Sequence, residues 1–175
     1  MIICEGDICV AYVRCLSLNA TLFLLRPLFA KSGLLWEDRA MRIGAFEIQE
    51  PVPDFKDLHV IALLHPWVDA GSVGTLTLES LEEHFGAKEF GKLQRPGNFF
   101  DFTRYRPTSR LVDGERVIIV PNTNIYYALG TDGPDFLFMH LMEPHAYAER
   151  YVKSLVQLFE AFNVKRYCRI SGMYN

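Results

Sequence analysis

The first segment that could bind a ligand is HPWVDAGSVG, at residues 65–74, which combines an acid, a serine and two glycines. It follows an apolar run and precedes a helical pattern, so it lies between a predicted strand and a predicted helix. Ligands of open α/β sheets bind at this position, where helix N-termini offer free N–H groups to anions. Asp69, Gly71 and Ser72 are therefore candidate ligand-binding residues. In the alternative interpretation, Asp69 or Ser72 only caps the helix and the glycines serve the turn.

The second segment is FFDFTRYRPT at residues 99–108, in which an acid and two arginines interrupt an aromatic run. Such charges are costly to bury unless they are paired, so Asp101 and Arg106 are expected to form a structural ion pair. Alternatively, Arg106 faces a carboxylate or phosphate ligand, for which its planar guanidinium is suited. Interleaved aromatic and basic residues are also typical of nucleic-acid stacking surfaces.

Charge argues against that last interpretation. The chain has 18 basic and 21 acidic residues and a formal net charge of −3. Binding to nucleic acid or to an anionic membrane surface needs clustered basic charge, so we expect neither partner.

Two further polar residues follow predicted strands. Asn122 comes after one of them, and Glu143 comes after another and just before a predicted helix. Glu143 is expected either to cap that helix or to join Asn122 in a ligand site. The histidines His140 and His145 have a poor spacing for metal ligation. These residues therefore predict no metal site and no cofactor, and they leave the catalytic residues unknown.

An α/β architecture would position these residues. The run VIALLH is apolar at successive positions, which suits a strand covered on both faces, as in a parallel sheet. Asp113-Gly114 is a strong turn signal, and Pro144 is expected in the first turn of a helix. Strands are predicted over residues 43–48, 58–65, 99–103, 116–121, 125–129, 135–141 and 166–171, and helices over 72–86 and 144–163.

The first 40 residues differ from the rest. They contain three of the four cysteines and an apolar stretch at 16–30 that charged residues and a proline interrupt. That stretch is a poor membrane span and a poor signal peptide. We predict an N-terminal extension over 1–40, with Met41 as the alternative start, and an α/β domain over 41–175. The competing interpretation is a genuine extra strand and helix. The cysteine spacings indicate reduced thiols and a cytoplasmic protein.

Five short motifs occur together and in order. They are WVDAG at 67–71, FDF at 100–102 followed by Arg-Pro at 106–107, LVDG at 111–114, IVP at 119–121, and Glu-Pro at 143–144. In these motifs, over residues 43–175, the chain resembles the proteasome assembly chaperone family. The resemblance is to the archaeal and bacterial relatives of the second subunit of the paired eukaryotic chaperone.

The resemblance implies a three-layer α/β fold with a mostly parallel sheet flanked by helices, similar to purine nucleoside phosphorylase-like hydrolases and phosphorylases. It also implies homo-oligomers, protein partners such as proteasome-like subunits, and further strands and helices beyond residue 175. It supplies no catalytic residues.

Two functions remain open. One is a protein-interaction or assembly factor, in which Asp69, Arg106 and Glu143 are paired or cap helices. The other is an enzyme or sensor in which at least two of them converge on one pocket that binds a small anionic or nucleoside-like ligand.

Overall fold

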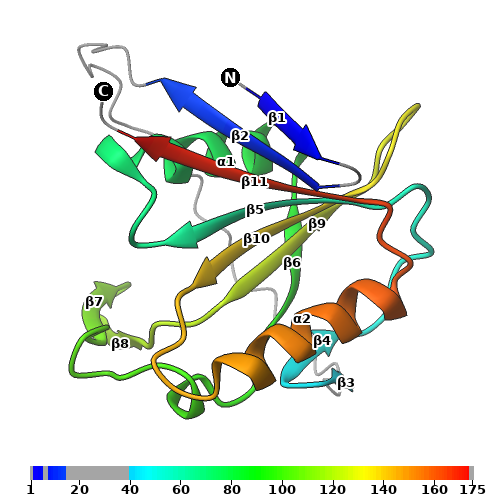
Figure 1. Cartoon of the computed structure of the whole chain (residues 1–175). Coiled ribbons are helices and arrows are strands. Elements are labelled where there is room, and N and C mark those ends of the chain that lie inside the picture. The colour runs from blue at the N-terminus through cyan, green and yellow to red at the C-terminus, as the bar shows by residue number, and fades with distance from the viewer. Residues whose placement is uncertain (1, 6–7, 15–39, 174–175) are drawn as a thin grey trace.

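The computed structural model describes residues 2–5, 8–14 and 40–173, and its centre is a nine-stranded sheet (Figure 1). The strand order is β1-β2-β11-β5-β10-β9-β6-β4-β3. The strands are β1 (Ile2–Glu5), β2 (Ile8–Arg14), β3 (Ala40–Ile43), β4 (Phe46–Gln49), β5 (His59–His65), β6 (Lys88–Leu93), β9 (Asn124–Ala128), β10 (Phe136–Met142) and β11 (Arg166–Met173).

The sheet is mixed, so the prediction of a mostly parallel sheet is wrong. Of its eight strand pairings within the described ranges, three are parallel, joining β2, β11, β5 and β10. The other five are antiparallel. The apolar run of β5 correctly indicated a strand covered on both faces. It carried no information on strands β9, β6, β4 and β3, which pair with their neighbours in antiparallel fashion.

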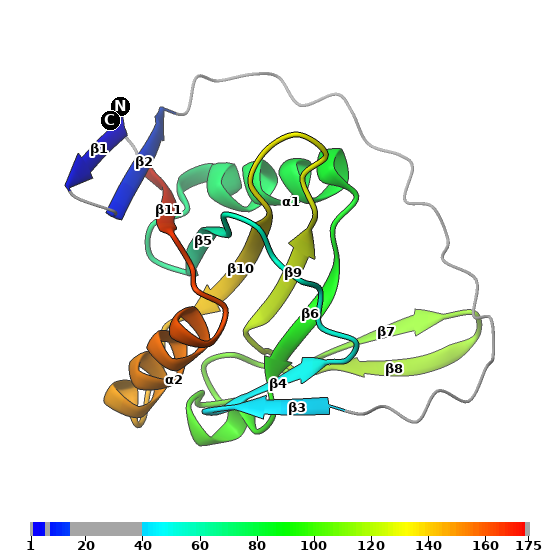
Figure 2. The same ribbon diagram turned by 90° about the vertical axis from the view of Figure 1, so that its right-hand side faces the viewer.

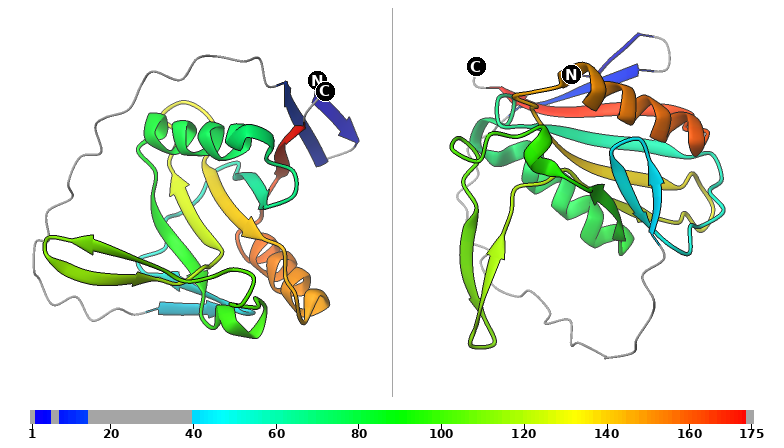
Figure 3. Two further views of the ribbon diagram at one scale, coloured as in Figure 1. Left: turned by 90° about the vertical axis from the view of Figure 1, so that its left-hand side faces the viewer. Right: turned by 90° about the horizontal axis from the view of Figure 1, so that it is seen from below.

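Two α-helices cover opposite faces of the sheet, as Figures 2 and 3 show. They are α1 (Val73–Phe85) and α2 (Ala148–Ala161). Alternate residues of β5 contribute to two cores, because successive side chains of a strand point to opposite faces. Leu63 packs with Leu78 of α1, whereas Val60 and Ala62 belong to the core that contains Leu158 of α2. No helix within the described residues is long and apolar enough to cross a membrane.

Helix α1 confirms its prediction closely. It ends at Phe85, and Gly86 follows with φ +62°, the left-handed conformation that glycine adopts readily. Helix α2 begins later than predicted, at Ala148, and is preceded by Tyr147 in a left-handed conformation. The predicted start at Pro144 is wrong because the preceding backbone is bound elsewhere. The N–H groups of His145 and Ala146 donate to the carbonyl oxygen of Phe99.

Three strand predictions need correction. The predicted strand 43–48 is a hairpin, β3–β4, whose turn contains Gly44 at φ +57°. The aromatic residues 99–103 form turns, with the Phe100 N–H donating to the Pro96 carbonyl and the Tyr105 N–H to that of Asp101. The third correction is an omission, because the sequence predicted neither β6 nor the strand over Thr108–Val112.

A separate hairpin projects from the body of the molecule (Figure 2). It consists of β7 (Thr108–Val112) and β8 (Glu115–Ile119), which pair with each other and with no other described strand. Asp113 and Gly114 form its turn with positive φ, as the sequence predicted. Every residue in the two strands is exposed.

Candidate functional site

Several of the candidate residues lie on segments that follow the parallel strands β5 and β10 at their carboxyl ends, near the end of β11. There the segments that follow β5 and β10 are tied together, since the Glu143 N–H donates to the His65 carbonyl oxygen at 3.0 Å. The end of β11 joins them through an isolated parallel bridge between Asp69 and Gly172. This edge is where α/β sheets bind ligands.

Asp69 holds the first turn of α1. Its Oδ1 accepts hydrogen bonds from the N–H groups of Gly74 (2.6 Å) and Thr75 (3.2 Å), and its Oδ2 accepts one from the Thr75 hydroxyl at 2.5 Å. A Cβ on Gly74 would lie 2.9 Å from Asp69 Oδ1 and 2.6 Å from a Leu63 methyl, so this close approach requires glycine. The capping interpretation therefore holds for Asp69. Ser72 forms no side-chain capping bond.

A first open pocket of about 400 Å³ lies beside this turn. Its polar carboxylate, Asp69, already accepts three hydrogen bonds from α1, so it is poorly placed to bind a ligand as well. Two large apolar side chains of this pocket are exposed, Trp67 at 77% and Met173 at 59%. The lining residues are Pro66, Trp67, Asp69, Ala70, Gly71, Gly172 and Met173. The pocket therefore offers apolar contact more than charge.

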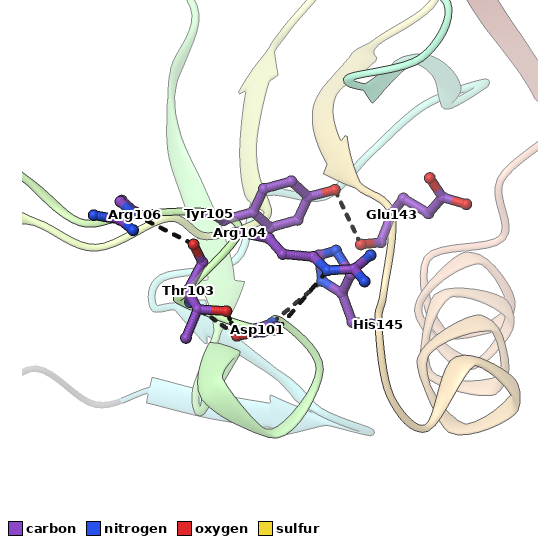
Figure 4. Close-up of polar contacts among 7 residues, drawn as sticks. All are labelled: Asp101, Thr103, Arg104, Tyr105, Arg106, Glu143 and His145. Carbon is purple, nitrogen blue, oxygen red and sulfur yellow. Dashed lines mark hydrogen bonds and ion pairs between the residues drawn. The ribbon is translucent and has the colours of Figure 1, made fainter.

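The Asp101 turn forms the second part of the edge (Figure 4). Asp101 Oδ1 accepts hydrogen bonds from the Thr103 N–H (2.8 Å) and the Thr103 hydroxyl (2.7 Å). Both bonds lower the pKa of the Asp101 carboxyl from its usual value, and the bond from the Thr103 hydroxyl has the larger effect.

The predicted ion pair of Asp101 with Arg106 is wrong. The tight turn at Asp101 brings the Arg104 Nε to 4.0 Å from Asp101 Oδ2 instead. Arg106 has passed beyond the turn, and its Nε donates to the Thr103 carbonyl at 3.4 Å.

His145 and Tyr105 complete this turn. His145 Nδ1 accepts the Asp101 N–H at 3.2 Å, and its ring lies 4.6 Å from the Tyr105 ring between centroids. The Tyr105 hydroxyl donates to the Glu143 carbonyl oxygen at 3.3 Å, as Figure 4 shows. Burial, followed by the Glu143 charge, raises the pKa of Tyr105. Sequence reasoning set His145 aside as a metal ligand and missed this role, because a histidine that accepts a backbone bond has no local sequence signal.

A second open pocket of about 490 Å³ lies at the Asp101 turn. Arg104, His145 and Asp101 provide its charged and polar groups, and aromatic and small residues provide the rest. The lining residues are Gly97, Phe99, Phe100, Asp101, Arg104, His145 and Ala146.

Asn122 and Glu143 have structural surroundings of their own. The Asn122 side chain forms two hydrogen bonds with the Leu93 backbone, accepting from its N–H at 3.2 Å and donating to its carbonyl at 3.1 Å. Glu143 is exposed and lies five residues before α2, so the expectation that it caps this helix is wrong.

The structure thus divides the predicted site residues instead of uniting them. Asp69 and Gly71 line the first pocket, and Asp101 lines the second. The remaining four candidates line neither of these two pockets: Ser72, Arg106, Asn122 and Glu143.

A cluster of titratable groups lies between α1 and the sheet. His140 Nε2 is 2.6 Å from the Glu82 carboxylate, and the ring of His65 stacks on that of His140 with centroids 6.3 Å apart. Burial, followed by the neighbouring His140, lowers the pKa of His65. No group of three or more His, Cys, Asp or Glu residues in the described part of the chain is arranged to hold a metal ion.

Comparison with known families decides how the chain is classified. The model of the PAC2 family matches residues 63–175, which include both pockets and the β7–β8 hairpin. The chain belongs to the PAC2 family. This confirms the resemblance that the sequence motifs predicted. No curated protein sequence matches the chain significantly.

Solved structures share the PAC2 fold at low sequence identity. A PAC2-family protein from Streptomyces avermitilis is 22% identical, with a TM-score of 0.62, over 68% of this chain and 51% of its own. A proteasome-assembly chaperone homologue from Mycobacterium tuberculosis is 20% identical, with a TM-score of 0.60, over 66% and 49%. An archaeal proteasome activator from Pyrococcus furiosus is 20% identical, with a TM-score of 0.54, over 71% and 49%. The PAC2 chain described here therefore spans about half the length of these relatives.

Proposed function

We propose that this PAC2-family chain is a protein-interaction or assembly factor, similar to proteasome assembly chaperones, that acts without catalysis of its own. The observation that carries the proposal is the use of its candidate polar groups. Asp69 binds the first turn of α1, Asp101 binds its own turn, and Asn122 binds the backbone of β6. Side chains used in this way maintain the shape of a surface. A ligand-binding enzyme or sensor would instead direct several of them into one cavity.

The descriptions of two structural relatives support the choice of partner. One is a proteasome-assembly chaperone homologue and another is an archaeal proteasome activator. We infer that the partners are proteasome-like subunits and that the protein is a cytoplasmic homo-oligomer. The proposal also includes a domain over residues 41–175 and an extension over 1–40, whose strands β1 and β2 add to the sheet beside β11. We propose that its fold is of the purine nucleoside phosphorylase-like type. The helices on both faces of a partly parallel sheet support this assignment.

Trp67 is the side chain we assign to partner binding. It is 77% exposed beside the first pocket, and tryptophan is enriched among residues that dominate the energy of protein interfaces. Its removal should therefore weaken binding strongly while leaving the fold intact. Leu129 provides a matched control, because it is 55% exposed and follows β9, at the opposite edge of the sheet.

The experiment uses the whole chain as immobilised bait with purified proteasome α-type subunits from the same organism. We expect the wild type and Leu129→Ala to retain the subunits, and Trp67→Ala to lose at least tenfold in affinity. If both variants retain the subunits equally, Trp67 is not part of the interface. A cooperatively folded wild type that binds no subunit would overturn the proposal.

The ligand-binding alternative has its own test. A thermal-shift screen would use nucleosides, nucleotides, phosphate and small carboxylates. A ligand specific for the native state stabilises it by about 2.7 kcal/mol at a hundred times its dissociation constant, which is easily measured. A clear shift that Arg106→Ala abolishes would favour the enzyme or sensor function. We expect no such shift.

A further inference from the structure

The β7–β8 hairpin, residues 108–120, is the least covered part of the described chain and is called the arm below. All ten residues of its two strands are exposed. It exposes six large apolar side chains, namely Leu111 (72%), Val112 (49%), Val117 (43%), Ile118 (67%), Ile119 (43%) and Val120 (45%). By the strand register, Val112, Val117 and Ile119 lie on one face of the arm and Leu111 and Ile118 on the other, so both faces carry exposed apolar side chains.

Strand β8 has an unprotected edge. One edge pairs with β7, with Ile119 opposite Thr108 and Ile118 opposite Ser109, and the other edge pairs with no strand among the described residues. Residues 117–120 read VIIV, four consecutive β-branched apolar residues. Proteins normally protect a free edge with charged residues or bulges, because an open apolar edge pairs with other strands. Its charged residues, Glu115 and Arg116, lie only at the turn end.

We propose that β8 pairs in antiparallel fashion with β8 of a second copy of this chain, which gives a four-stranded sheet β7-β8-β8′-β7′. The inference rests on the homo-oligomer named in the proposed function and assigns its interface. It is independent of the surface around Trp67, which remains available to other partners.

The charges of the arm select β8 over β7 as the pairing strand. In a two-fold symmetric antiparallel pair each strand lies against its own copy. The middle residue of β7 is Arg110, so a symmetric β7 pair would place two guanidinium groups opposite each other, which destabilises a sheet. The middle of β8 carries no charge.

The apolar run also selects the register. Centring the pair on Ile118 places Val117 opposite Ile119 of the other copy and Arg116 opposite Val120. Centring it on Val117 would place both charged residues of β8 opposite isoleucines. The first register therefore keeps the charges at the two ends of the apolar contact.

The apolar run of β8 agrees with a second copy as the occupant. The β8–β8′ contact joins residues 117–120 of both copies along one strand edge and leaves Leu111 and Val112 of β7 outside it. Permanent interfaces between identical chains are also the most apolar class. A second copy supplies the same edge and satisfies this requirement without another protein.

The test measures molecular mass by sedimentation velocity over a range of protein concentrations. We expect the wild type to have at least twice the 20.1 kDa of one chain, and Ile118→Lys to have half the wild-type mass. Leu111→Lys is the matched control. It adds the same charge to an even more exposed residue of the arm, but on β7, and should leave the mass unchanged. Cooperative thermal melting of each variant checks that it is folded.

A charge-swap experiment tests the register. Ile118→Lys and Ile118→Glu are each expected to be monomeric alone and to associate when mixed, because the register places residue 118 opposite itself. Failure to associate on mixing would overturn this register. A monomeric wild type, or a folded Ile118→Lys variant that still self-associates, would overturn the interface.

The outcomes distinguish this inference from the proposed function. Ile118→Lys should still bind proteasome α-type subunits as a monomer, and Trp67→Ala should still self-associate. If the wild type is monomeric and the arm instead mediates binding to those subunits, the inferred self-pairing is wrong while the assembly function stands.

Discussion

The hydroxyl groups of Tyr151 and Thr123 lie 2.7 Å apart in the interior, where they join helix α2 to the segment before β9. Both residues are almost fully buried, at 2% and 0% exposure. Burial raises the pKa of Tyr151 to about 12, so its hydroxyl remains protonated throughout the physiological range. The pair gives the larger of the two cores an internal polar contact that joins α2 to the residue before β9.

Tyr151→Phe removes this hydroxyl and leaves that of Thr123 buried without its partner. We expect a loss of about 1–2 kcal/mol in the free energy of unfolding, the usual cost of an unsatisfied buried hydroxyl. Urea denaturation measures it. The double variant Tyr151→Phe/Thr123→Val removes both hydroxyls and should recover part of the loss. If it is no more stable than the single variant, the hydrogen bond is not the source of the effect.

Asp69→Ala should destabilise the protein by about 1–2 kcal/mol, the upper part of the range for helix-capping residues. The reason is that its carboxylate accepts three hydrogen bonds from Gly74 and Thr75. The matched control is Ser72→Ala, since Ser72 is exposed and forms no capping bond. It should change stability by less than about 0.5 kcal/mol. Equal losses in chemical denaturation of the two variants would contradict the assigned role of Asp69.

Acid should weaken the fold partly through His65. Burial and the neighbouring His140 lower the pKa of His65 below the ordinary 6.5. The charges of Asp69 and Glu79 raise it, but their effect is smaller. The unfolded chain therefore binds a proton more readily than the native one. The stability from this residue is complete above pH 6.5 and is lost as the pH falls through the folded pKa. Urea midpoints between pH 7.5 and 5 should fall less for His65→Gln than for the wild type. If the urea midpoints of the two proteins fall in parallel with pH, His65 does not contribute to the loss of stability in acid.

Thr103→Val should raise the pKa of the Asp101 carboxyl toward its ordinary value of 3.8, because the Thr103 hydroxyl is the main group that lowers it. The carbon-13 chemical shift of that carboxyl, followed by NMR from pH 2 to 6, measures the change. Thr108→Val, a threonine outside this turn, should leave the pKa of Asp101 where it is. An unchanged value in Thr103→Val would mean that the hydrogen bond in the turn has no influence on Asp101.

The elements with continuous patterns were predictable from the sequence. The apolar runs of β5 and β10 and the helical period of α1 with its terminating Gly86 were identified within one or two residues. Strand β6 was missed because a bulge between Glu89 and Gly91 breaks its alternation, so that two successive residues are buried.

Other elements were predicted wrongly because contacts with other parts of the chain overrode a local sequence signal. The aromatic residues at 99–103 have strand propensity, but hydrogen bonds to Pro96 and Asp101 fold them into turns. Pro144 is suited to a helix start, yet the residues after it bind the Phe99 carbonyl.

In the candidate site, too, local contacts were predictable from the sequence and contacts between distant residues were not. Asp69 acts within its own turn, so its capping role was available from sequence as an alternative. The choice of Arg104 over Arg106 as the partner of Asp101 depends on how tightly the turn closes. The bond from the Asp101 N–H to His145 spans 44 positions and has no local signature.

The mixed sheet also determines how the chain can assemble over time. In the antiparallel half, the β3–β4 hairpin closes between Ile43 and Phe46, three positions apart. In the parallel half, β5 and β11 pair from His59 and Arg166, which are 107 positions apart. Contacts between distant positions form slowly, because a long loop must close before they contribute stability. The first pocket includes Gly172 and Met173 at the end of β11, so we expect it to be completed late in folding.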